Sequence, residues 1–168
     1  MQALGRLYDA SVGLAPYDSN AAAGTGVRVG LADSPGGVDF VLFKGAGSGT
    51  DVPVLTLQEH SASSGGTSQA LARITEHYRK SATPLNGTET WTRVTQAASA
   101  TLTLTGEATK QGIYVVHVEA SWLSDGFGYV SVNVADTGAA GAQLLGVLAI
   151  TTGLASQRSP QNLPAVLR

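Results

Sequence analysis

The stretch QGIYVVHVEASWLSDGFGYVSVNVAD, residues 111–136, decides the fold class of this chain. Val116 and Val118 share one face of its first half, and valines share one face of its second half at Val130, Val132 and Val134. A period of two places successive side chains on opposite faces of a β-strand. An aspartate–glycine pair between the two runs is typical of a turn. The stretch therefore predicts two strands joined by a turn or a single helical turn.

Similar strand signals recur along the rest of the chain, with turn residues between them. They are VRVGL (27–31), VDFVLFK (38–44), PVLTLQEH (53–60), ETWTRVTQ (89–96), SATLTLTG (99–106) and LLGVLAITT (144–152). LARITEHYRK (71–80) fits helical spacing in part, but it is short and lacks a capping box, so we interpret 73–80 as a strand. Asn86-Gly87 predicts a tight turn after it. These signals predict an all-β chain, a single antiparallel β-sandwich or jelly-roll of about eight to nine strands.

Two of these runs are apolar on both faces. VDFVLFK (38–44) is nearly continuous in apolar residues, which predicts a central strand covered on both sides. LLGVLAITT (144–152) predicts either a central strand or one covered by a neighbour. Both interpretations assume that apolar surface in a folded protein is removed from water.

The length of 168 residues is that of one domain. We expect an N-terminal arm or edge strand at 1–20, the sandwich at 21–153, and an extended C-terminal tail at 154–168. Charged residues make up only 13% of the chain, against the usual ~25%. This deficit indicates that part of the surface is covered by something else.

Composition also argues against several classes of function. A net charge of -2 without a basic run disfavours direct nucleic-acid binding. No apolar stretch approaches the ~18–20 residues that span a bilayer, and the first residues lack the pattern of a signal peptide. We therefore expect no membrane partner and synthesis in the cytoplasm. The chain has no cysteine, which excludes disulfides and thiol chemistry.

No motif points to catalysis, a metal or a cofactor. The loop GAGSGTD (45–51) lacks the Lys and the following helix of a phosphate-binding loop. His60, His77 and His117 do not share the spacing of a local metal pair. No Gly-x-Ser-x-Gly elbow lies between a strand and a helix. The prediction is no catalytic residue, no metal and no cofactor.

The two tryptophans are the large anchors of the chain. Trp91 and Trp122 can each serve as core packing or as a lid on a loop. Trp122 lies in the turn between two strands, so it is the better candidate for a subunit interface, where tryptophan is enriched.

Four stretches together carry a resemblance to a known group of proteins. They are VLTLQEHSASSGG (54–66), ETWTRVTQA (89–97), LSDGFGYVSVNVADTG (123–138) and QRSPQNLP (157–164). In this order, on a small all-β chain, they resemble head decoration (cement or auxiliary capsid) proteins of tailed bacteriophages. The resemblance implies a non-enzymatic protein on the exterior of the virion, which binds the major capsid protein and bridges its neighbouring copies. It also implies possible self-association, since such proteins often form trimers at threefold positions.

Three other functions stay open. A phage tail-tube or head–tail connector subunit usually needs a long hairpin, and no unusually long alternating pair is present. A carbohydrate-binding β-sandwich module needs aligned aromatic residues, and the chain has only two Trp, five Tyr and three Phe. A hydrolase on a β-sandwich would need a convergent polar set, which the sequence does not reveal.

The tail 154–168 has two possible roles. Its prolines favour an extended course, so it either folds back over an edge strand of its own sandwich or lies on a neighbouring subunit or the capsid. Candidate partner-binding residues are Trp122, Arg158, Pro160, Asn162, Leu163, Pro164 and Leu167.

Overall fold

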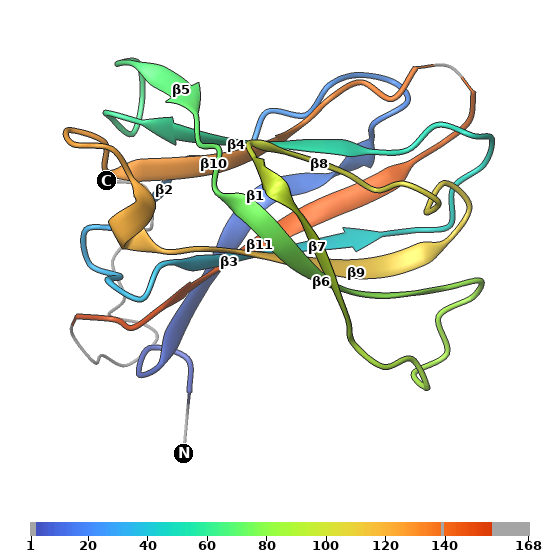
Figure 1. The fold of residues 1–168 in the computed structure, drawn as a ribbon, viewed down its shortest axis with the longest axis horizontal. Helices are drawn as coiled ribbons and strands as arrows, with labels where there is room; N and C mark the ends of the chain where they lie inside the picture. The colour runs from blue at the N-terminus through green and yellow to red at the C-terminus, as the bar shows by residue number, and fades with distance from the viewer. Residues whose placement is uncertain (1–2, 139, 156–168) are drawn as a thin grey trace.

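The computed structural model describes residues 3–138 and 140–155, which fold into two packed β-sheets (Figure 1). It is 49% strand and 2% helix, which confirms the predicted all-β sandwich. The described residues form eleven strands rather than about eight to nine. The additional strands are residues 68–70, which are too few for a periodic signal in the sequence, and residues 8–18, which belong to the segment expected as an N-terminal arm or edge strand.

One sheet has six strands and the other has five. In spatial order, the first contains β1 (Tyr8–Asp18), β11 (Leu144–Thr152), β3 (Val38–Lys44), β9 (Gln111–Val118), β6 (Ile74–Ala82) and β7 (Thr92–Ser99). The second contains β2 (Val29–Gly30), β10 (Tyr129–Val134), β4 (Val54–His60) and β5 (Ser68–Ala70), with β8 (Thr101–Thr103) paired to β4.

The strand pairing is nested. β1 pairs with β11, β2 with β10 and β3 with β9, each antiparallel, while β4 pairs with β5. Successive pairs alternate between the two sheets, which is the topology of a jelly roll. The hairpin of β6 and β7 widens one sheet of this eight-stranded frame, and β8 widens the other.

The side-chain alternation in residues 111–136 correctly predicts which of their side chains lie in the core. Val116 and Val118 of β9 are buried, as are the three valines of β10, Val130, Val132 and Val134. A short 3₁₀ helix, η1 (Ala120–Trp122), occupies the turn between the two strands. Residues 74–82 form strand β6, in agreement with the interpretation of that segment as a strand.

The loop between β6 and β7 differs from the tight turn that the sequence predicts. Gly87 has a positive φ of 91°, but no described residue other than glycine does, so Asn86-Gly87 does not form the tight turn that needs positive φ at both positions. A longer loop joins β6 to β7 instead, and the Glu89 carboxylate accepts hydrogen bonds from the backbone N–H groups of Asn86 and Gly87 at 2.9 and 3.0 Å.

The prediction that 38–44 is covered on both sides is wrong for the described part of the chain. β3 and β11 are central strands of their sheet, with Phe40 and Leu42 buried between the sheets. Their outer sides nevertheless stay open, and Phe43 is 58% exposed. None of residues 3–138 and 140–155 forms a third layer over this face.

Residues 8–18 of the expected N-terminal arm form β1, an edge strand of the six-stranded sheet. The tail residues proposed for partner binding, Arg158, Pro160, Asn162, Leu163, Pro164 and Leu167, lie outside the described residues.

Candidate docking face

Outward-facing apolar side chains cross the six-stranded sheet in a continuous row. In the strand register, Val12 pairs with Leu148, Leu148 with Val41, Val41 with Val115, and Val115 with Tyr78. Directly paired side chains on one face of a sheet lie about 5 Å apart. The row is therefore a contiguous apolar surface over five strands.

A hollow lies beside this row, over Gly146 of β11. Gly146 pairs with Phe43, so a position without a side chain adjoins a protruding ring. A Cβ at position 146 would come within 3.1 Å of Pro16 Cγ, so Pro16 closes the floor of the hollow. We call this surface of β1, β11 and β3 the docking face.

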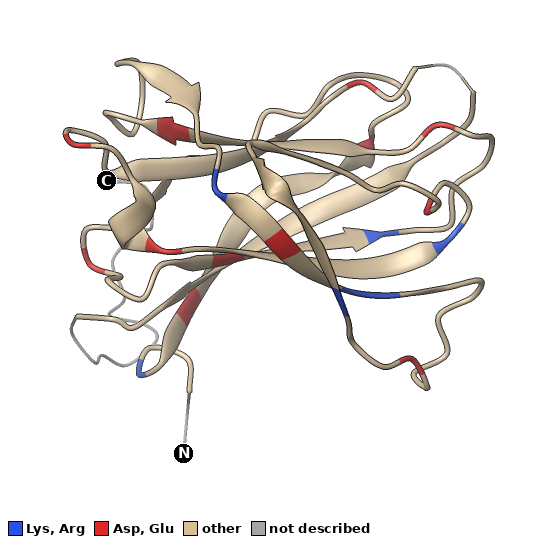
Figure 2. Ribbon diagram, in the orientation of Figure 1, with Lys and Arg blue, Asp and Glu red and all other residues tan. Residues whose placement is uncertain are grey.

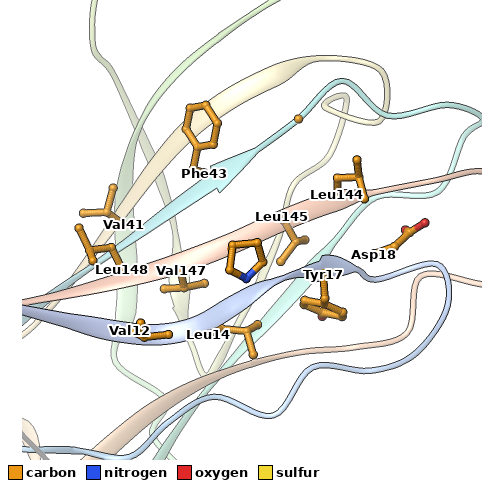
Figure 3. A pocket seen from close by; sticks show the side chains of 13 residues that line it. Val12, Leu14, Tyr17, Asp18, Val41, Phe43, Leu144, Leu145, Val147 and Leu148 are labelled. Atoms are coloured by element: carbon orange, nitrogen blue, oxygen red, sulfur yellow. The ribbon is translucent and has the colours of Figure 1, made fainter.

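The hollow has a volume of about 690 Å³. In Figure 3, Val41 and Phe43 lie on one side of β11 and Val12 lies on the other. Phe43 (58%), Leu144 (54%) and Leu148 (43%) are strongly exposed for such large apolar residues. The lining residues are Val12, Leu14, Pro16, Tyr17, Asp18, Val41, Phe43, Gly45, Leu144, Leu145, Gly146, Val147 and Leu148.

The docking face is nearly free of charge. β11 carries no Lys, Arg, Asp or Glu, and it is tan throughout in Figure 2. Asp18 is the single ionisable carboxylate among the lining residues. Its Oδ1 accepts hydrogen bonds from the backbone N–H groups of Asn20 and Gln143 at 3.0 and 2.8 Å. Asp18 therefore serves local structure, and the surface offered to a partner is apolar.

The outer face of the five-stranded sheet is polar, in contrast to the apolar docking face. Gln58 of β4 and Asn133 of β10 are diagonal neighbours on adjacent strands, and the Asn133 Nδ2 donates to Gln58 Oε1 at 2.7 Å. Thr56 follows in the same row. One outer face of the sandwich is thus polar and suited to water, whereas the other is apolar.

Trp122 lies at the far end of the six-stranded sheet from the hollow, on η1. It is half-buried and packs against the core, and its ring meets that of His117 edge-on with centroids 6.3 Å apart. It also lines a pocket of about 270 Å³ with Tyr78 and Val115, where the apolar row ends. Trp122 therefore takes part in core packing, and its role in a subunit interface stays a prediction.

Trp91 has a different setting. It is 49% exposed, next to β7, and the Lys80 ammonium lies 5.1 Å from its ring centroid. This geometry is a cation–π contact. Trp91 lines neither the hollow nor the Trp122 pocket.

The histidines do not converge. His60 lies between two hydroxyl groups, with Nδ1 2.7 Å from Ser68 Oγ and Nε2 2.8 Å from Ser131 Oγ. Burial lowers the pKa of His60, and the nearby Arg28 cation lowers it further. Ser131 is buried, so this serine–histidine contact does not face a substrate. His117 pairs instead with Asp39, through Nδ1 and Oδ1 at 2.8 Å.

Two further observations concern the described residues alone. No group of three or more His, Asp or Glu side chains among them is arranged to hold a metal ion. None of their helices is long and apolar enough to cross a membrane.

The amino-acid sequence alone does not reveal where the docking face lies. Its main residues, Val12, Phe43, Leu144 and Leu148, were assigned to strands but not to a site. The available signal was the apolar character of both faces in 38–44 and 144–152, which we interpreted as coverage within the fold.

The fold and this face define a class of protein, an all-β jelly-roll sandwich with one apolar and one polar outer face. Comparison of the chain with protein-family models, with curated proteins and with solved structures gives no match.

Proposed function

We propose that this protein is a non-enzymatic structural protein of a tailed-phage virion. It binds the outer surface of the capsid and stabilises the shell by bridging neighbouring major capsid proteins. The observation that carries the proposal is the uncharged docking face around Gly146, with Phe43, Leu144 and Leu148 exposed to solvent. Contiguous apolar patches on a protein surface commonly mark contacts with other proteins.

The size of the docking face favours a partner that presents the same site many times. Three strands at about 4.8 Å spacing and about six residues at ~3.3 Å rise give a footprint of roughly 300 Å². A stable free-standing dimer buries about 800 Å² on each partner. A contact of this size is weak alone, but it gains strength when one molecule bridges several sites on an array. A capsid shell is such an array, so we assign the face to the shell protein rather than to a second copy.

The fold adds support by analogy alone. Jelly rolls recur in virion and lectin domains, but a fold by itself does not define a function. The low proportion of charged residues, 13% of the chain, agrees with a surface that is partly covered in its assembled state.

The test is sedimentation of the purified protein with mature capsids that lack it. We expect the wild-type chain to sediment with the capsids and to raise the temperature at which they open. Phe43→Asp and Leu148→Asp place a carboxylate on the docking face. Each should weaken capsid binding by about tenfold or more, because buried apolar anchors dominate interface energy.

Leu7→Asp is the matched control. Leu7 is 60% exposed, as strongly as Phe43, but it lies before β1 and outside the hollow. It should bind capsids like the wild type. Absence of binding to mature capsids, assembly into tubes, or capsid binding that Phe43→Asp leaves intact would each contradict the proposal.

A further inference from the structure

The Trp122 pocket is a second feature of the six-stranded sheet, separate from the docking face. It lies toward β9 and β6, whereas the hollow lies between β1 and β3. Tyr78 and Trp122 contribute aromatic rings to its lining, and Val115 and Ile74 contribute aliphatic groups. Its volume of about 270 Å³ is just below the range of drug-sized ligand sites, ~300–1,000 Å³. It is therefore sized for a single small ring.

Two acceptors in the pocket are open. Asp39 uses Oδ1 to pair with His117, and Glu119 uses Oε2 to accept a hydrogen bond from Ser121 Oγ at 3.2 Å. The second oxygen of each carboxylate accepts no hydrogen bond from the described residues. Both oxygens of Glu76 are already used, since Oε2 accepts from the Arg93 guanidinium and Oε1 accepts from the Tyr78 hydroxyl at 3.5 Å. The pocket thus offers two carboxylate oxygens to a ligand.

Two nitrogen groups are open as well. Arg73 lines the pocket; its backbone N–H donates to the Leu71 carbonyl at 2.9 Å and its positive charge acts on Glu59, but its guanidinium donates no hydrogen bond to another described side chain. His117 uses Nδ1 toward Asp39, so its Nε2 is left to face solvent or a ligand. Arg73 is a donor, whereas the Nε2 of His117 donates or accepts according to the tautomer, so the lining carries both donors and acceptors beside the rings of Trp122 and Tyr78.

The presence of both carboxylates and a guanidinium in the lining favours a ligand without net charge. A cation would satisfy the two carboxylates but would face Arg73, and an anion would satisfy Arg73 but would face Asp39 and Glu119. A hydroxyl group both donates and accepts, so a neutral ring with several hydroxyls matches all four groups. The apolar C–H face of such a ring can pack on an aromatic side chain, which buries apolar surface in the same contact.

We infer that the Trp122 pocket binds a neutral pyranose sugar, with Asp39, Glu119, Arg73 and His117 as hydrogen-bond partners and Trp122 and Tyr78 as the ring-contacting surface. This binding site goes beyond the proposed capsid contact and does not depend on it. It would give the protein a glycan-binding surface over β3, β9 and β6.

The test uses the Trp91→Phe variant, in which Trp122 is the remaining tryptophan and reports on the pocket by fluorescence. Methyl glycosides of glucose, galactose, mannose and N-acetylglucosamine are titrated to about 100 mM, a range that covers the weak affinity expected of a single ring with few contacts. At least one glycoside should give a saturable change in Trp122 emission. In an amide NMR titration the same glycoside should shift resonances of 115–122 and 73–78.

Asp39→Asn should weaken the binding of that glycoside by at least about fivefold, since a hydrogen bond to a charged group contributes more than a neutral one. Tyr78→Ala should weaken it by a similar factor, since it removes an aromatic surface on which the sugar ring packs. Asp125→Asn, which removes an exposed carboxylate outside the pocket, is the matched control and should bind normally. Circular dichroism establishes that each variant is folded.

The inference is overturned if no glycoside gives a saturable response, if blocked arginine or acetate binds more tightly than every sugar, or if Asp39→Asn and Tyr78→Ala both bind like Asp125→Asn. Capsid binding without sugar binding would reject this inference alone, whereas sugar binding without capsid binding would reject only the proposed function.

Discussion

His77 lies on the inner side of β6, where it is buried, and its Nδ1 has no hydrogen-bond partner among the described residues. Burial lowers the pKa of His77, and the positive charge of Arg79 lowers it further, against an opposing effect of Glu107. The folded protein therefore holds His77 neutral at pH values where the unfolded chain would already be protonated.

The lowered pKa of His77 predicts how the free energy of unfolding depends on pH. The unfolded state takes up a proton at His77 near pH 6.5, and the folded state does so only at lower pH. The unfolded state thus binds more protons in this window, so the free energy of unfolding should fall as pH drops below about 6.5. Thermal melting between pH 7 and pH 5 measures the effect.

His77→Leu should flatten this pH dependence in part, and His77→Leu with His60→Gln should flatten it further, because the pKa of His60 is also lowered by burial. The paired carboxylates Glu59 and Glu107 titrate at lower pH and do not obscure the window, since hydrogen bonds to their side chains overcome the effect of burial and lower the pKa of each. A double variant with the full wild-type slope would contradict this account.

At the scale of elements, one end of the sandwich is held together by two buried polar side chains. Lys44 ends β3 and is fully buried, and its ammonium donates to the carbonyl oxygens of Gly45, Ala108 and Lys110 at 3.2, 2.9 and 2.9 Å. Gln143 precedes β11, and its Nε2 donates to the carbonyls of Ser48, Asp51 and Ala108. The loops after β3 and before β9 and β11 are therefore joined through these two residues.

Lys44→Met should cost about 3 kcal/mol of stability, because it leaves buried carbonyl oxygens without a donor. For a domain of this size the melting temperature should fall by roughly 6–12 °C. Lys80→Met is the control, since the Lys80 ammonium contacts an exposed Trp91 ring rather than buried carbonyls. Equal melting temperatures for Lys44→Met and the wild type would show that the loops are held by other contacts.

At the scale of the whole molecule, the asymmetry of the two outer faces is the main feature. The five-stranded sheet presents Gln58 and Asn133 to water, whereas the six-stranded sheet presents Phe43 and Leu148. An antiparallel sheet commonly packs one face on the core and leaves the other in water. An apolar outer face departs from that rule, and it is the basis of our proposal that the molecule forms part of a larger assembly.

Deletion of residues 157–168 tests the role of the tail in that assembly. The deletion leaves the core residues of the described chain, Leu14 to Ala149, in place, so we expect the melting temperature to stay within about 2 °C of the wild type. Capsid affinity should fall if the tail contacts the shell. A large loss of thermal stability with unchanged capsid binding would indicate instead that the tail covers its own sandwich.

The sequence by itself determined the fold class and most of the inner face. Side-chain alternation is a local property of each strand, so Val116, Val118 and the valines of β10 could be assigned to the core without knowledge of their neighbours. The same local rule could not say whether the second apolar side of 38–44 and 144–152 was covered, because coverage depends on what packs there. Only the tertiary structure showed Phe43, Leu144 and Leu148 open to solvent.

The Trp122 pocket could be located only from the tertiary structure. Asp39, Tyr78, His117 and Trp122 come from three strands and a 3₁₀ turn, and they meet because β3, β9 and β6 are adjacent in the sheet. Strand order is set by pairing between residues far apart in the chain, which no short stretch of sequence encodes. The sequence thus specified the strands and their buried sides, and the arrangement of the strands decided which exposed residues could form a site.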